Sequence, residues 1–503
     1  MVDNKIYNFV LILLSITGFF MIWISSHWGI GVSPDSIQYI KGARGLVTGK
    51  GVFNLSPHWP PGYPIALYLL SFLFDDIVYT ARVFQALIFS INIWLFSRLT
   101  NQGSTSAQLV SISAAFFILT SVEAYSIHFM AWTEGVFISL QLLSLYFLSQ
   151  YYLTNKVVGL LISALFAAIA LGFRYAGIAF IGTACISILL FSSNTSFKRR
   201  FFYCGLYGLI SVSTFVIWGV GNKIVHGSTA NREFVFHLIP YEKIINFPKL
   251  IIFWFGRDGA EIHTCIIILI IFIAVIIKLY KWYTGKDNDD DFLQRFSLLY
   301  CILYTFFIFI SITFIDAYIP IDQRIFFPVY IFFFLFLFRI ARCYYLNNIN
   351  IIYKTIISII IGYLCFYNLF FLDKKIKSNI DHGSFILSEY WFRLPILNYL
   401  KTHNFNQVNI YSNAMDALYL HLNINGEILP YKYNPTTLKN NKLFNSEVMF
   451  LVSEYKKGNA MIIWLYATNY RTYLISLDSL TNSITNNPIY NGPDGVIFYK
   501  KNM

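Results

Sequence analysis

Long apolar runs separated by short polar segments dominate the first three quarters of the chain. The first run, residues 7–25, follows a sparse basic N-terminus and lacks a good signal-peptide cleavage site, so it predicts a spanning helix. Ten more runs fit a spanning helix, at about 79–98, 107–122, 133–151, 157–173, 175–192, 201–222, 262–280, 295–315, 325–341 and 352–371. The pattern therefore predicts a mainly α-helical polytopic membrane protein with about 11 transmembrane helices.

The apolar pattern ends near residue 374, where lysines and then Asn-rich stretches with turn signals begin. We expect a transmembrane domain over residues 1–373 and a small α/β domain over residues 374–503, which is near the usual domain size. The expected elements are two buried strands (Val408–Tyr411 and Met461–Tyr466), each followed by a helix (Met415–Leu422 and Tyr470–Leu477), and a final hairpin over Asn491–Tyr499.

The first polar loop, residues 28–64, is the least apolar part of the first half of the chain. Ser33 is a good N-cap, Pro34 suits the first helical position, and Asp35 suits the first turn, so an amphipathic interfacial helix is expected here. A rigid aromatic turn over Trp59–Pro64 follows. The next apolar piece is too short to span and predicts a re-entrant or interfacial segment. The loop thus holds a carboxylate on a helix at the membrane edge.

Composition agrees with a membrane protein. Hydrophobic residues make up 57% of the 503 residues and charged residues only 12%, about half the charged share of a soluble domain. The formal net charge of +12 is better explained by cytoplasmic anchoring to membrane lipid than by nucleic-acid binding. The 6 cysteines lie in or beside apolar runs and form no CxxC pair, so neither a metal site nor a disulfide framework is predicted.

Basic clusters in alternate loops predict the topology. Lys198–Arg200, Lys278–Lys286 and Arg339–Lys354 fall on one side when the N-terminus is cytoplasmic. The same assignment places the 28–64 loop and the C-terminal domain on the extracytoplasmic side of the cell membrane.

Four ionisable residues stand near the expected outer face, and each has an ordinary explanation beside a functional one. Asp35 could stabilise a helix dipole or act as a general base. Glu134 could be an interfacial carboxylate or a second carboxylate in the same outer cavity. Arg174 could anchor the chain to lipid headgroups, and Arg324 could belong to a plain polar turn. Either arginine could instead bind a phosphate through its guanidinium fork. Arg257 belongs to another outer loop, whose polar residues could line a cavity or simply lie at the surface.

Several motifs, taken in order, resemble the C-type glycosyltransferase superfamily, in particular bacterial membrane enzymes related to protein O-mannosyltransferases and the lipid A aminoarabinose transferase. The matching segments are SPDSIQYIKGARGL with Asp35, HWPPGYP at His58–Pro64, TEGVF with Glu134, FRYAG with Arg174, and DQRIFFPVY with Asp322 and Arg324. They cover about the first 340 residues. Many relatives carry a second acidic residue after the first, where this chain has Ser36, so no metal site is predicted.

The resemblance implies a polyprenyl-phosphate-linked sugar donor and a glycan, lipid or protein acceptor, with the site facing outside. It assigns a catalytic role to Asp35, donor or acceptor contacts to Glu134, His58 and Tyr63, and phosphate contacts to Arg174, Arg324 and Arg257. No cofactor is predicted; a divalent metal ion stays open, but no motif indicates one. A transporter or flippase and a polysaccharide polymerase or ligase are the alternatives.

Overall fold

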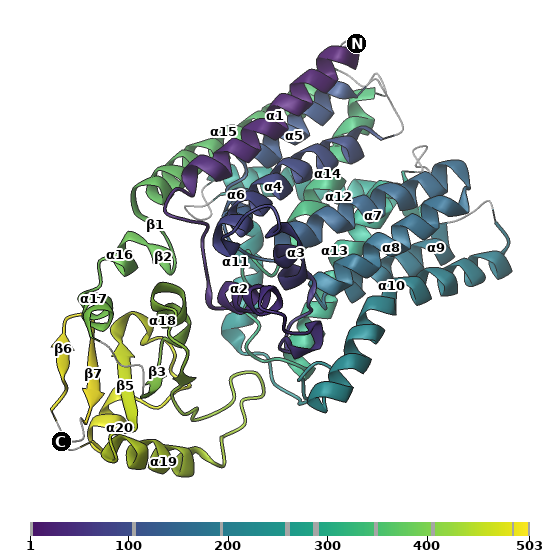
Figure 1. The fold of residues 1–503 in the computed structure, drawn as a ribbon. Helices are drawn as coiled ribbons and strands as arrows, with labels where there is room; N and C mark the ends of the chain where they lie inside the picture. Colours follow the sequence, from purple (N-terminus) through teal and green to yellow (C-terminus); the bar gives the residue numbers. More distant parts are fainter. Residues whose placement is uncertain are drawn as a thin grey trace.

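The computed structural model describes residues 4–102, 107–191, 195–256, 262–284, 291–346, 351–403, 408–484 and 487–500. Figure 1 shows a long helical bundle, with a small sheet domain at one end. The helical part consists of α1 (Asn4–Ser25), α2 (Pro34–Val47), the 3₁₀ turn η1 (Val52–Asn54), α3 (Gly62–Leu70), α4 (Ile77–Asn101), α5 (Gln108–Thr120), α6 (Val122–His128), α7 (Glu134–Thr154), α8 (Val157–Phe173), α9 (Gly177–Phe191), α10 (Phe197–His226), α11 (Tyr241–Phe253), α12 (Ile262–Tyr283), α13 (Phe292–Phe314), α14 (Phe327–Leu346) and α15 (Ile351–His382).

Every apolar run identified in the sequence forms a helix, so the protein is a multi-pass membrane protein. Within the described ranges, eight helices are long and apolar enough to cross a membrane, and a bent pair, α5 and α6, brings the number to nine. The two remaining runs, α8 and α9, form apolar helices of 17 and 15 residues. Helix α15 continues without a break through residue 374 and ends at His382, beyond the expected domain boundary.

The bend between α5 and α6 shapes the end of the bundle nearest the sheet domain. The two helices meet at 58° around Ser121, whose side chain accepts a hydrogen bond from the backbone N–H of Ala124 at 3.0 Å. The same hydroxyl lies 2.9 Å from the Tyr330 hydroxyl on α14. The chain therefore turns at Ser121 and leads through α6 into the segment Trp132–Glu134, which is part of the candidate site.

The C-terminal domain contains a five-stranded sheet in the order β4-β3-β5-β7-β6. The pairs β3–β4 and β3–β5 are parallel, whereas β5–β7 and β6–β7 are antiparallel. A separate antiparallel pair, β1–β2, follows α15. The elements are β1 (Gly383–Ser384), β2 (Leu387–Ser388), α16 (Glu389–Phe392), α17 (Pro395–Thr402), β3 (Asn409–Ser412), α18 (Met415–Leu422), β4 (Glu427–Ile428), α19 (Phe444–Lys456), β5 (Ala460–Leu465), η2 (Tyr466–Thr468), α20 (Leu477–Thr481), β6 (Tyr490–Gly492) and β7 (Gly495–Tyr499).

Both predicted strands, the helix Met415–Leu422 and the final hairpin are confirmed. The predicted helix at Tyr470–Leu477 is wrong. Leu474 instead forms an antiparallel bridge with Tyr431, and the backbone N–H of Ile475 donates to the Pro430 carbonyl at 2.9 Å. Pairing with a distant segment therefore overrides the helical pattern, and the next helix begins only at Leu477.

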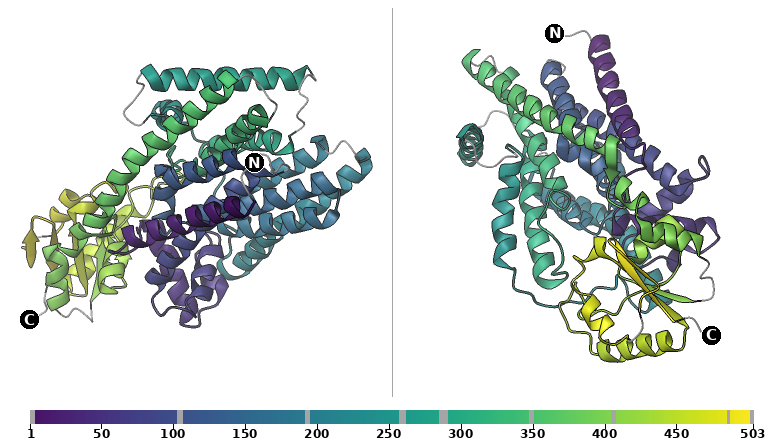
Figure 2. Two further views of the ribbon diagram at one scale, coloured as in Figure 1. Left: turned by 90° about the horizontal axis from the view of Figure 1, so that it is seen from above. Right: turned by 90° about the vertical axis from the view of Figure 1, so that its left-hand side faces the viewer.

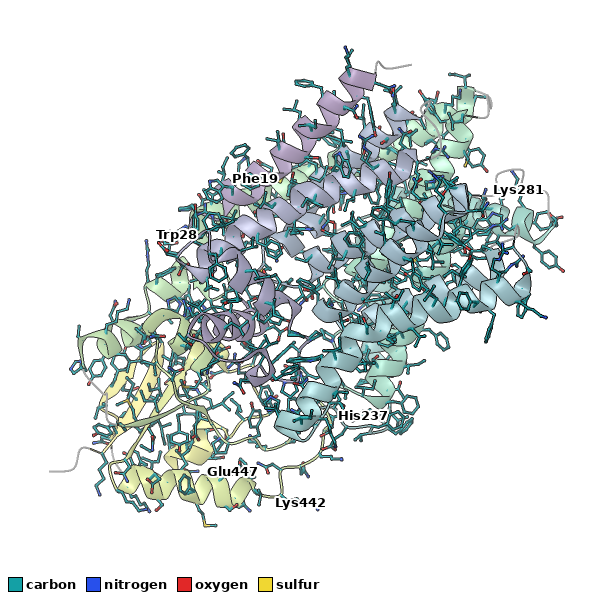
Figure 3. All side chains as sticks on the ribbon, turned by 45° about the vertical axis from the view of Figure 1, so that its right-hand side comes forward. Phe19, Trp28, His237, Lys281, Lys442 and Glu447 are labelled. Atoms are coloured by element: carbon teal, nitrogen blue, oxygen red, sulfur yellow. The ribbon has the colours of Figure 1, made fainter. Side chains whose placement is uncertain are left out.

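The sheet domain packs directly on the polar loops of the bundle. On α2, Lys41 and Arg44 lie over the ring of Tyr419 in α18, at 5.3 and 5.5 Å from its centroid. His237 Nε2 lies 3.0 Å from the Thr437 carbonyl oxygen. Two further views show the domain at one end of the bundle, away from the N-terminus (Figure 2). Lys281, in a basic cluster, lies at the opposite end of the bundle (Figure 3).

Candidate active site

Helix α2 presents Asp35 from its first turn. Ser33 is the N-cap, Pro34 occupies the first turn, and a reciprocal capping box joins Ser33 to Ser36. The Ser33 hydroxyl accepts from the Ser36 N–H, and the Ser36 hydroxyl accepts from the Ser33 N–H. Because the two serines satisfy the helix start, the Asp35 carboxylate is available for contacts outside the helix. Its side chain is 35% exposed.

Glu134 provides the second carboxylate and begins helix α7. Its side chain is completely buried. Two guanidinium groups approach it: Arg324 Nε lies 2.5 Å from Oε1, and Arg174 Nη1 forms an ion pair with the same oxygen. A buried carboxylate is tolerated when charged donors replace its water, and these two arginines supply that replacement.

Arg324 connects the two carboxylates. Its Nη1 lies 2.7 Å from Asp35 Oδ2 while its Nε contacts Glu134. Burial alone lowers the pKa of Arg324, but the carboxylates of Glu134 and Asp35 raise it well above its ordinary value. The loop before α14 holds this arginine in place: Asp322 accepts from the Ile325 N–H, and the Tyr304 hydroxyl donates to the Ile325 carbonyl, both at 2.9 Å. Arg324 therefore remains charged between two acids.

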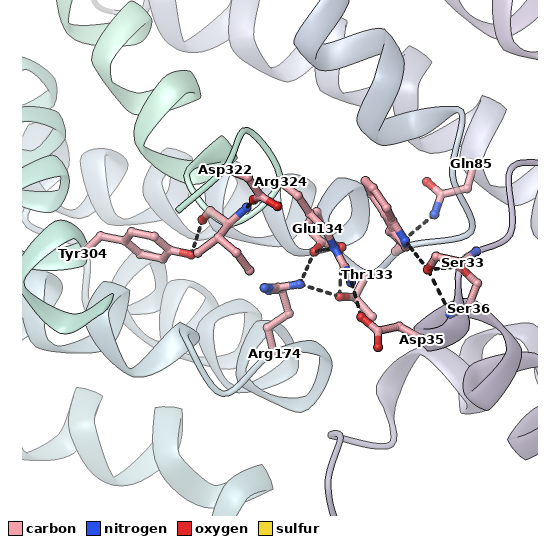
Figure 4. A network of polar contacts seen from close by, with 12 residues as sticks. Ser33, Asp35, Ser36, Gln85, Thr133, Glu134, Arg174, Tyr304, Asp322 and Arg324 are labelled. Atoms are coloured by element: carbon pink, nitrogen blue, oxygen red, sulfur yellow. Dashed lines mark hydrogen bonds and ion pairs between the residues drawn. The ribbon is translucent and has the colours of Figure 1, made fainter. Parts of the chain in front are cut away.

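Arg174 reaches the same cluster from the tight connection between α8 and α9. Besides its ion pair with Glu134, its Nη1 donates to the Thr133 hydroxyl at 3.1 Å. The sequence places this residue between two apolar runs with almost no loop, and the structure places its guanidinium against the start of α7 (Figure 4). Four charges from four distant segments thus meet, two positive and two negative.

Trp132 is a member of this cluster that we did not identify from the sequence. Its indole ring lies under the Arg324 guanidinium, 4.3 Å from the ring centroid, and its Nε1 donates to the Ser33 hydroxyl at 2.8 Å. It therefore links the arginine to the cap of α2. A tryptophan two residues before Glu134 is the signal that could have been used.

Tyr63 and His58 lie outside the four-charge cluster. Tyr63 is fully buried, and its hydroxyl accepts from Gln85 Nε2 at 2.9 Å. Gln85 also donates to the Trp132 carbonyl, so Tyr63 is connected to the cluster through Gln85. His58 Nε2 lies 3.4 Å from Arg232, which pairs with Asp316. Burial first, and then the charge of Arg232, lower the pKa of His58 to about 4.

The remaining predicted phosphate ligand, Arg257, lies outside the described residues. The sequence does not predict the pair Arg232–Asp316, because neither residue lies in a segment that carries the resemblance. Within the described ranges, no group of three or more His, Cys, Asp or Glu side chains could hold a metal ion. The cluster itself consists of two guanidinium groups paired with two carboxylates. The roles assigned to its residues remain predictions.

Comparison with known proteins supports the resemblance. Residues 58–218 match the family described as dolichyl-phosphate-mannose-protein mannosyltransferase. A search among curated proteins gives no match. The chain is similar to the crystal structure of ArnT from Cupriavidus metallidurans bound to undecaprenyl phosphate, with a TM-score of 0.62, 12% identity, and coverage of 96% of this chain and 97% of that chain. The chain is also similar to ArnT from Cupriavidus metallidurans in the apo state, with a TM-score of 0.61, 13% identity, and coverage of 96% of this chain and 96% of that chain. The protein therefore has the C-type glycosyltransferase fold seen in ArnT, and the resemblance predicted from the sequence is confirmed at the level of the fold.

Proposed function

We propose that the protein is a membrane glycosyltransferase that moves a sugar from a polyprenyl-phosphate donor to an extracytoplasmic glycan, lipid or protein acceptor. The observation that carries the proposal is the pair of arginines on one buried carboxylate, with a second, partly exposed carboxylate on Arg324. The similarity to ArnT, whose structure contains undecaprenyl phosphate, supports the choice of donor.

The difference between the two carboxylates suggests how the donor binds. Glu134 is inaccessible and holds both guanidiniums, whereas Asp35 is partly exposed and contacts Arg324 alone. An incoming lipid phosphate competes with the more accessible acid for the arginine. Phosphate binding therefore frees Asp35 at the moment when a donor is present, because the guanidinium exchanges one anion for another.

The freed carboxylate then accepts a proton from the acceptor hydroxyl or amine. The acceptor oxygen or nitrogen forms a bond to the anomeric carbon, and the bond from that carbon to the phosphate oxygen breaks. The electron pair stays on the lipid phosphate, and Arg324 and Arg174 stabilise the charge that develops there. A direct displacement of this kind inverts the anomeric configuration.

The test uses the purified full-length protein in liposomes containing undecaprenyl phosphate linked to a radiolabelled sugar. Cell-envelope extract is added as the source of acceptor, and release of undecaprenyl phosphate is followed with transfer of label. We expect release that depends on both protein and extract, and formation of a product with inverted configuration. Movement of intact lipid-sugar between leaflets without release would refute the proposal and favour a flippase.

A further inference from the structure

A hollow of about 720 Å³ lies where α15 meets the C-terminal domain, and none of the four site charges lines it. Its walls come from the last turns of α15, the β1–β2 hairpin, α16 and the turn between β6 and β7. The volume is in the range of sites for small ligands. It lies at the C-terminal end of α15, the last of the described helices that is long and apolar enough to cross a membrane.

Phe385 is the unusual residue in this wall. It occupies the first position of the two-residue turn between β1 and β2 with φ +53°, a conformation that favours glycine. Its ring does not compensate by burial, because the residue is 53% exposed. An exposed aromatic residue on an unfavourable backbone is unusual, and it leaves part of the Phe385 ring surface free for a ligand.

The remaining lining is polar, and both of its carboxylates already have partners within the chain. Glu389 forms ion pairs with His382 and Arg393. Asp494 accepts hydrogen bonds at 2.7 Å from the Tyr490 hydroxyl and from a backbone N–H. Lys375, Arg393 and His382 line the hollow beside these two carboxylates. The other polar lining groups are hydroxyl or amide side chains, on Ser378, Asn379, Ser384, Ser388 and Tyr390.

Two half-exposed aromatic residues, Phe385 and Tyr390, line the hollow together with serine hydroxyl groups. A sugar unit has apolar C–H faces that pack on aromatic rings and hydroxyl groups that exchange hydrogen bonds with serine. A phosphate, in contrast, would have to displace Glu389 from Arg393 and His382. The lining chemistry therefore fits a neutral carbohydrate better than an anion.

The hollow is next to the candidate active site. The Phe385 ring contacts the Trp132 ring at a centroid distance of 6.3 Å, and Trp132 lies against Arg324. The N–H of Ile386 donates to the carbonyl of Val32, three residues before Asp35, at 3.3 Å. We propose that this hollow binds a glycan acceptor through neutral sugar units, with Phe385 and Tyr390 as stacking surfaces. The inference rests on the proposed function and names the class of its acceptor.

The substitution Phe385→Gly separates binding from folding, because glycine suits the backbone at this turn. Leu438→Gly is the matched control: Leu438 has φ +54° and is 54% exposed, but it does not line the hollow. The probes are cellobiose, maltose, chitobiose and lactose, with saturation-transfer NMR as the readout on the full-length protein in detergent. We expect at least one disaccharide to bind. Its affinity should be about two- to tenfold weaker in Phe385→Gly and Tyr390→Ala.

Binding should be unchanged in Leu438→Gly, and the thermal midpoint of Phe385→Gly should equal or exceed that of the wild type. The inference is overturned if no disaccharide binds, if Phe385→Gly binds as well as the wild type, if both glycine variants weaken equally, or if glucose 1-phosphate binds better than glucose. Undecaprenyl phosphate binding and release are measured on the same samples. If undecaprenyl phosphate binding and release are present but the acceptor inference fails, the proposed function is still supported. If the wild type neither binds nor releases undecaprenyl phosphate, the proposed function itself is refuted.

Discussion

Replacing Asp35 with asparagine tests whether the two carboxylates on Arg324 have different tasks. The structural cost should be small, because the capping box of α2 uses Ser33 and Ser36. The lost ion pair is partly exposed, which corresponds to about 0.2–1 kcal/mol. Loss of the charge from the first turn adds about 0.3–1 kcal/mol. We therefore expect Asp35→Asn to lower the free energy of unfolding by less than about 2 kcal/mol.

The effect on the reaction should be much larger. Removing a general base lowers a rate by about 10²- to 10⁴-fold, which is about 2.7–5.4 kcal/mol of activation free energy. The affinity for undecaprenyl phosphate should not fall, and it should rise if the carboxylate competes with the phosphate for Arg324. The predicted signature is therefore a slow enzyme that is folded and binds donor at least as well as the wild type.

Glu134→Gln provides the comparison because it removes the other carboxylate from the same guanidinium. Glu134 is completely buried between two arginines, and loss of one partner of such a group costs about 3–5 kcal/mol. We expect this variant to unfold at a clearly lower denaturant concentration. The assay combines single-turnover sugar transfer, undecaprenyl phosphate binding and SDS titration of unfolding in mixed micelles.

Three results would refute the reasoning. Transfer by Asp35→Asn at the wild-type rate would exclude it as the base. Donor affinity that falls in parallel with the rate would show that Asp35 helps to bind the donor and does not compete with it. Equal destabilisation by Asp35→Asn and Glu134→Gln would show that the greater burial of Glu134 does not increase its contribution to the free energy of unfolding.

Three further predictions follow from single contacts. Arg324→Lys removes the fork that contacts two carboxylates, so undecaprenyl phosphate should bind at least about tenfold more weakly in equilibrium binding, and unchanged affinity would contradict this assignment. Burial and the charge of Arg232 lower the pKa of His58 from 6.5 to about 4, so the free energy of unfolding should be level above pH 6.5 and fall as the pH is lowered from about 6.5 to 4. His58→Gln should reduce this fall, and parallel pH profiles of the variant and the wild type would exclude the histidine as its source. Gly62→Ala places a Cβ 2.6 Å from the Gly172 carbonyl oxygen, so α3 must move away from α8, with a loss of about 1–3 kcal/mol in the same unfolding titration; a wild-type midpoint would show that the contact is not tight.

The sequence predicts those features that depend on local pattern. Run length identifies the spanning segments because a helix must satisfy its own backbone in lipid, and the helix start at Ser33 follows from capping chemistry. The predicted bounds of the helix Met415–Leu422 agree with the observed bounds, because both its hydrophobic pattern and its flanking residues define where it begins and ends. The resemblance in motif order also selects Asp35, Glu134, Arg174 and Arg324, which the fold brings together.

Contacts between distant segments are not visible in the sequence. The position of Trp132 beneath Arg324 depends on the bend between α5 and α6, and the helical pattern after Tyr470 yields to pairing with Tyr431. The unfavourable backbone of Phe385 cannot be inferred either, because the turn position with positive φ holds a phenylalanine and not a glycine. These features arise from tertiary packing, which overrides local preference.

The contact of α18 with α2 has a consequence for how the chain can be divided. Lys41 and Arg44 lie on the Tyr419 ring, and they belong to the same short helix that carries Asp35. A protein shortened after α15 would keep every spanning segment and every residue of the four-charge cluster, yet its first loop helix would lose the surface against which it rests. The helix that carries Asp35 thus rests on a part of the chain more than 370 residues downstream, so the proposed activity should require the C-terminal domain.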